Sequence, residues 1–156
     1  MNKSRNGGAA MVELAILLPV LLALFFGLAE LGRALLLEHT LLRHTEAAAR
    51  YLGRAHRGLA ADCSENAAWP DARATATHLA VYGNEAGSGE ALISGLDADD
   101  VTIAVESGGV PGGAVACVVR VSAALPYPGL FGDKIPLLGL DQPTLRAQSE
   151  ERYVGE

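Results

Sequence analysis

One carboxylate stands in the most apolar stretch of the chain. Glu13 is the only ionisable residue between Arg5 and Glu30. Placing an aspartate at the middle of a bilayer costs about 2.5–3.5 kcal/mol on insertion scales, and a carboxylate nearer the edge costs less. A plain membrane anchor would have no reason to carry this charge, so Glu13 is the first candidate for a functional role.

Other residue types that could do chemistry show no matching spacing. The four histidines have no cysteine or carboxylate at metal-ligand spacing, and Ser64 lacks the sequence context of a nucleophile. Asp97–Asp100 lacks the spacing of a calcium loop, so we interpret it as an acidic turn. The glycine cluster at 107–113 is followed by neither a lysine nor a helix and is no phosphate loop. These patterns predict no catalytic residue, no metal and no cofactor.

The only two cysteines are Cys63 and Cys117, both after the apolar stretch. An even count on a translocated side predicts one disulfide, whose closure would stabilise the fold by roughly 4 kcal/mol on the entropy model. Two free buried thiols in a cytosolic domain are the alternative.

Charge is unevenly distributed in this chain of 156 residues and net charge −6. Residues 58–156 contain 14 acidic and 5 basic residues. A nucleic-acid partner is therefore not expected, because neutralising phosphates requires a basic surface.

The stretch that positions Glu13 runs from Gly8 to Ala29. As a helix, residues 9–29 would span roughly 31 Å, about the thickness of a bilayer's hydrocarbon core. Four small or helix-bending residues at four-residue spacing form a candidate packing stripe, unless they reflect an alanine-rich composition alone: Ala15, Pro19, Ala23 and Gly27. A signal peptide cleaved after Ala29 is an alternative.

The helix should continue beyond the apolar stretch. Leu28, Leu31, Leu35, Leu42, Ala49 and Leu52 recur at helical intervals. Glu46 and Arg50 are spaced for an ion pair. We expect one helix from about Ala9 to about Arg57, with residues 9–29 in lipid and 30–57 amphipathic. Its apolar stripe must be covered by its own domain or by neighbouring copies.

Residues 58–156 predict a small α+β domain. A second helix is expected at 72–85, with Asp71 as its N-cap and Ala76, Leu79, Ala80 and Tyr82 buried. Strands are expected at 101–106, 114–125 and 144–154, the first two forming an antiparallel hairpin through 107–113. A Pro/Gly/Leu loop at 126–143 carries Leu130, Phe131, Leu137 and Leu138, which either pack on the sheet or meet a partner.

The order of a basic leader, a glycine, a glutamate and an unbroken apolar helix resembles the processing site of type IV prepilins. The wider stretch GGAAMVELAILLPVLLALFFGLAELGRALL, with AAARYL further on, resembles TadE-type pseudopilins of the tight-adherence (Flp) pilus system. The resemblance covers Gly8 to about Leu52. Leu14 follows the glutamate where major Flp pilins carry an aromatic residue, which favours a minor component of either TadE-like or TadF-like type.

This resemblance implies a substrate of a prepilin peptidase and not an enzyme. Residues 1–8 would be the leader and Gly8–Ala9 the scissile bond, because glycine lets the backbone extend into a protease cleft. Cleavage would expose a cationic amine on Ala9, which Glu13 of a neighbouring subunit could neutralise.

The same resemblance sets expectations for location and partners. The chain would cross the bacterial inner membrane once, with a cytoplasmic N-terminus and a periplasmic C-terminal domain. Its partners would be the peptidase, other pilin and pseudopilin subunits, the Tad secretion machinery and the bilayer. The alternative is a secreted or membrane-anchored binding module unrelated to pili.

Overall fold

The structure is a computed structural model that describes residues 5–109, 115–127, 129 and 143–155. Its elements are a long helix, a short helix and a three-stranded antiparallel sheet, which confirms the expected α+β class. The chain divides into two compact units, residues 1–35 and 36–156. Two expected features, the 107–113 turn and the 126–143 loop with its four large apolar side chains, lie mostly outside the described residues.

Helix α1 (Arg5–Gly53) is continuous through Pro19. The expected helix ran from about Ala9 to about Arg57. The observed helix begins four residues earlier and ends four residues earlier. The last turn tightens through Arg54 N–H to Tyr51 carbonyl and Ala55 N–H to Leu52 carbonyl hydrogen bonds of 3.2 and 3.1 Å. Arg57 then adopts a positive φ of 51°, which a helix does not allow.

The second half of α1 buries part of the expected stripe, since Ala49 and Leu52 are buried as predicted. Its core side chains lie at helical intervals along one face: Leu41, Thr45, Ala48, Ala49 and Leu52. Thr45 is buried because its hydroxyl donates to the Leu41 carbonyl at 2.7 Å. Leu42 is only half-buried, and the neighbouring Leu41 is buried in its place.

Helix α2 (Trp69–Tyr82) starts three residues before the expected Ala72. The N-cap is Ala68 and not Asp71, because Pro70 occupies the first turn, where its missing N–H is no loss. The helix ends at Tyr82, before the expected end at 85, because Gly83 caps it with a φ of 72° and an N–H bond to the Leu79 carbonyl. Ala76 and Ala80 are buried as expected, whereas Leu79 and Tyr82 are half-buried.

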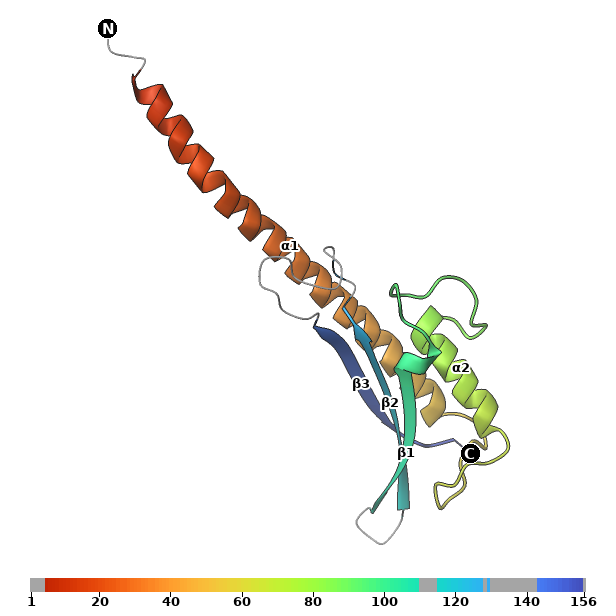
Figure 1. The fold of residues 1–156 in the computed structure, drawn as a ribbon. Helices are drawn as coiled ribbons and strands as arrows, with labels where there is room; N and C mark the ends of the chain where they lie inside the picture. The colour runs from red at the N-terminus through yellow and green to blue at the C-terminus, as the bar shows by residue number, and fades with distance from the viewer. Residues whose placement is uncertain (1–4, 110–114, 128, 130–142, 156) are drawn as a thin grey trace. The chain divides into compact units, whose positions relative to one another are not determined.

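The sheet has the order β1 (Val101–Gly109), β2 (Val115–Pro126), β3 (Thr144–Arg152), with both pairs antiparallel. The register places Ile103 opposite Val121 and Ala123 opposite Ala147. Figure 1 shows α2 and the C-terminal part of α1 on one face of the sheet. The expected hairpin is confirmed, and its alternating residues face these helices. Its first strand is longer than expected, because residues 107–109 pair with β2 and do not belong to the turn.

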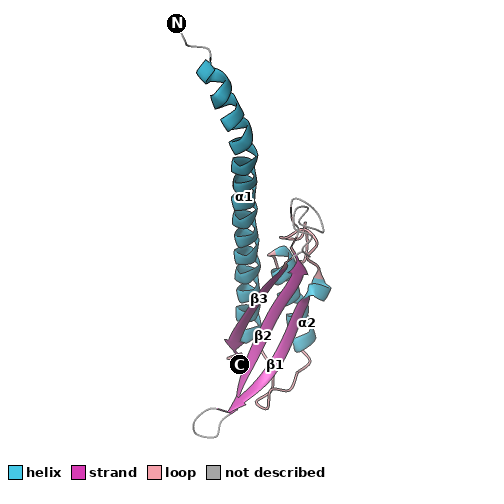
Figure 2. Ribbon diagram, turned by 60° about the vertical axis from the view of Figure 1, so that its left-hand side comes forward, coloured by secondary structure: helices cyan, strands magenta, loops and turns pink. Residues whose placement is uncertain are grey.

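The two faces of the sheet differ in chemistry. The helix-covered face and the helices share one core, which includes Leu52, Trp69, Ala76, Val119 and Val121. Trp69 Nε1 is buried without a hydrogen-bond partner among the described residues. On the other face, visible in Figure 2 as the face turned away from both helices, Arg120 joins the two outer strands. Its guanidinium donates to Glu150 on β3 at 2.7 Å and to Glu106 on β1. These two carboxylates raise the pKa of Arg120.

The connection between α1 and α2 is fixed to the sheet at Cys63. Cys63 and Cys117 form a disulfide with an S–S distance of 2.02 Å. Beside it, Asp62 accepts hydrogen bonds from the hydroxyl and the backbone N–H of Ser64, which lower the pKa of the Asp62 carboxyl. The disulfide therefore ties a short irregular segment to the central strand.

Candidate functional site: the start of the long helix

Gly8 and Ala9 both lie inside α1 and are exposed. A Cβ built on Gly8 would meet no heavy atom within 4 Å. The peptide bond between them is accessible, but a helical bond must unwind before it can extend through a protease cleft. Glycines make this local unwinding inexpensive, because each disfavours helix by about 1 kcal/mol relative to alanine.

Glu13 is exposed one turn after Ala9, on the same face of α1. Helical side chains tilt toward the N-terminus, so the Glu13 carboxylate leans toward the turn that Ala9 begins. Glu13 makes no ion pair or hydrogen bond to any residue that the structure describes. Its carboxylate is therefore available to a cation on another molecule.

The surface around Glu13 is apolar and uncovered. Every residue from Gly8 to Ala29 is exposed, including Leu14 at 55 % and Phe25 at 66 %. Over the described part of the chain, α1 is the one helix long and apolar enough to cross a membrane. Burying a leucine-sized side chain contributes about 1.5–3 kcal/mol, so this surface favours transfer into an apolar phase by tens of kcal/mol.

The proposed packing stripe is present as a line of exposed positions on α1. Ala15, Pro19, Ala23 and Gly27 follow one another at four-residue intervals. A Cβ on Gly27 would meet no atom within 4 Å. These four positions are therefore uncovered by the described residues of this chain.

The Asp97–Asp100 turn has a structural explanation. Asp97 caps the short 3-10 helix Ala98–Asp100 by accepting the Asp99 N–H at 2.8 Å. Asp100 reciprocates by accepting the Asp97 N–H at 3.0 Å. No group of three metal-ligating side chains occurs among the described residues.

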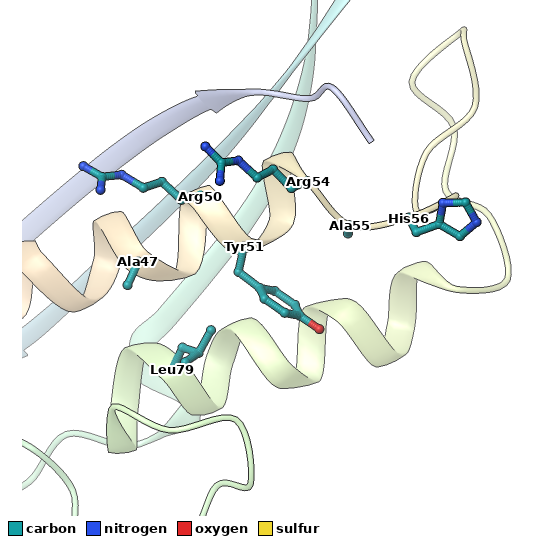
Figure 3. Close-up of a pocket in the computed structure, with 7 residues that line it drawn as sticks. All are labelled: Ala47, Arg50, Tyr51, Arg54, Ala55, His56 and Leu79. Atoms are coloured by element: carbon teal, nitrogen blue, oxygen red, sulfur yellow. The ribbon is translucent and has the colours of Figure 1, made fainter. Parts of the chain in front are cut away.

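A shallow cleft at the C-terminal end of α1 escaped the sequence reasoning. It is lined by Arg50, Tyr51, Arg54, His56 and Leu79, with two alanines (Figure 3). The seven- and four-residue spacing of Arg43, Arg50 and Arg54 was the available signal, because it places three arginines on one helix face.

Comparison with known proteins finds a similarity in one segment of the chain, residues 8–50. Residues 8–50 match the family model described as TadE-like protein, which confirms the resemblance over that segment. No curated protein and no solved structure matches the chain. The match begins at Gly8 and covers Glu13, the apolar surface and most of the remainder of α1.

Proposed function

We propose that this protein is a membrane-anchored minor pilin or pseudopilin that takes part in assembling a Tad-type pilus. The observation that carries the proposal is the coincidence of the TadE-like match with the uncovered apolar half of α1, both starting at Gly8. The role is structural, and catalysis belongs to a prepilin peptidase that takes this chain as its substrate.

Four parts of the chain have separate roles in this proposal. Residues 1–8 are a leader, 9–29 cross the inner membrane, 30–57 extend α1 out of it, and 58–156 complete a periplasmic domain. Lys3 and Arg5 precede the apolar stretch, which favours a cytoplasmic N-terminus. An oxidising periplasm is compatible with the disulfide between Cys63 and Cys117.

Glu13 acts after cleavage in this proposal. The new Ala9 amine of one subunit and the Glu13 carboxylate of its neighbour form an ion pair in a poorly hydrated environment, where an unpaired carboxylate would be costly. The pairing fixes the axial register between packed helices, and Ala15, Pro19, Ala23 and Gly27 let those helices approach closely. Other pilin subunits and the Tad machinery in the inner membrane are the corresponding partners.

The processing step is tested by determining the N-terminus of the protein purified from its native host. We expect Ala9 when the peptidase is present and Met1 when it is deleted. An N-terminus near Glu30 would support the second candidate, a binding module released by signal peptidase, for which Gly27-Leu28-Ala29 is a possible cleavage sequence. Met1 in both strains would contradict processing.

The assembly role of Glu13 is tested by comparing Glu13→Ala and Glu13→Gln with Glu38→Ala. Glu38 is an exposed glutamate on the same helix and serves as the control. We expect both Glu13 variants to be processed normally and to be depleted from pili, while Glu38→Ala is incorporated like the wild type. Equal incorporation of all three variants would contradict the role of Glu13.

A further inference from the structure

The outward face of α1 in the second unit is positively charged. Arg43, Arg50 and Arg54 are all exposed. At 100° per residue their side chains fall within a sector of about 40°, on the side of α1 opposite the core residues Leu41 and Leu52. We call these three arginines the arginine face.

Ion pairs within the domain leave this face mostly unneutralised. Arg50 approaches Glu46 at 3.5 Å, in a pair whose side chains are 65 % and 42 % exposed. Arg43 and Arg54 form no ion pair with any described residue. Such an exposed pair contributes little, about 0.3–0.5 kcal/mol, so Arg50 can exchange partners at small cost.

The cleft beside the arginine face is also without negative charge. Its polar lining consists of Arg50, Arg54, His56 and the Tyr51 ring with its hydroxyl, and no carboxylate of the described residues borders it. Figure 3 shows Arg50 and Arg54 extending from the side of α1 that faces away from α2 and Leu79. The guanidinium groups therefore project outward, where a second molecule can reach them.

The same chain carries a matching negative segment. Residues 74–119 contain no lysine or arginine, and residues 85–100, which connect α2 to β1, contain five carboxylates. Asp97 and Asp100 serve as caps. The other three, Glu85, Glu90 and Asp99, are exposed and make no side-chain hydrogen bond or ion pair with described residues. We call residues 85–100 the acidic segment.

We propose that the arginine face of one molecule binds the acidic segment of a second copy of this chain. The acidic segment adjoins α2 (Figure 1), whereas Arg50 and Arg54 point away from α2, so the two surfaces are suited to meet between molecules. Because the two surfaces are different, the contact is heterologous and each copy can bind one neighbour through each surface. Such contacts propagate in one direction, and their strength depends on ionic strength.

This contact uses neither Gly8 nor Glu13, so it stands or fails separately from the proposed processing and assembly roles. It is tested with the full chain in detergent micelles by sedimentation at about 0.02 M and about 0.5 M salt, where the Debye length differs several-fold. We expect wild-type association at low salt to weaken at least about tenfold at high salt. Association that is insensitive to salt would overturn the proposal and would indicate contact through the apolar half of α1.

Charge reversal identifies the two surfaces. Arg50→Glu/Arg54→Glu and, separately, Glu90→Lys/Asp99→Lys should each lose the salt-sensitive association. The four substitutions combined in one chain should restore it, because each surface then carries the opposite charge. Restoration also shows that the variants fold, and failure to restore with native circular dichroism would overturn the proposal.

Cross-linking locates the contact. Arg50→Lys/Arg54→Lys retains the charge and allows a carbodiimide to join the lysines to nearby carboxylates, with Arg146→Lys on the exposed face of β3 as the control. In a mixture of labelled and unlabelled chains, we expect links between copies to residues 85–100 for the double variant and none for the control. Links only to Glu46 of the same chain would overturn the proposal.

Discussion

The Tyr153 hydroxyl donates a hydrogen bond to the Ala55 carbonyl at 2.7 Å, across 98 residues of sequence. The same oxygen accepts the N–H groups of Gly58 and Leu59 at 2.8 and 3.1 Å. One phenol thus satisfies three backbone groups where the chain leaves α1. The segment after β3 is held there as well, because the Val154 N–H donates to the Gly53 carbonyl at 2.7 Å.

Replacing Tyr153 with phenylalanine should lower the free energy of unfolding by about 1–3 kcal/mol. The ring remains, but the part-buried Leu59 N–H loses its acceptor, while the Gly58 N–H keeps only its 3.3 Å bond to the Ala55 carbonyl. Leaving such a group unpaired has this cost. The measurement is urea unfolding of the full chain in detergent, followed by circular dichroism. Tyr82→Phe is the control, because the Tyr82 hydroxyl bonds no described residue, and equal effects of both variants would contradict the assignment.

Removing the disulfide should destabilise the domain by about 4 kcal/mol. Cys63 and Cys117 are separated by 54 residues, and opening a loop of this length returns that much conformational freedom to the unfolded chain on the entropy model. The measurement compares Cys63→Ser/Cys117→Ser with wild type before and after a reductant. The reductant should lower the stability of wild type only, and an effect on the serine variant would point to a different cause.

Comparing alanine substitutions at Leu52 and Leu36 tests which part of α1 the domain covers. Leu52 is 0 % exposed and Leu36 is 69 % exposed. Leu52→Ala should cost about 2–5 kcal/mol of unfolding free energy through lost transfer energy and a cavity, whereas Leu36→Ala should change it by less than about 0.5 kcal/mol. Similar losses for both would mean that something also covers Leu36 in the folded protein.

The sequence predicted the elements better than their ends. Alternation in β1 and β2 is a local signal, and it correctly placed Val119 and Val121 on the buried face. The start of α2 was misplaced because Asp71 matches an N-cap by type, while Pro70 can occupy the first turn just as well. The turn after α1 was not predicted because the Tyr153 hydroxyl that bonds it is far away in sequence.

The functional residues show the same contrast: features that are contiguous in sequence were predicted, and features that depend on tertiary packing were not. The glycine, the glutamate and the apolar run are contiguous, so the sequence alone located them. The arginine face required knowing which side of α1 the core occupies. Periodicity suggested Leu42 for the buried stripe, yet the domain buries Leu41 and the hydrogen-bonded Thr45.

Gly155 provides a second test of the Tyr153 contact. A Cβ at Gly155 would lie 2.6 Å from the Tyr153 hydroxyl and closer still to the Ala55 carbonyl oxygen. Gly155→Ala should therefore displace the hydrogen bond between them and cost about 1–3 kcal/mol of unfolding free energy, as overpacking does.

Combining the two changes should cost less than their sum. Once Tyr153→Phe has removed the hydroxyl, Gly155→Ala has less of the contact left to disturb, and residues that share one partner couple by about 0.5–3 kcal/mol. The measurement is a double-mutant cycle by urea unfolding. Strict additivity would mean that the added methyl acts on the Ala55 backbone alone and not through the phenol.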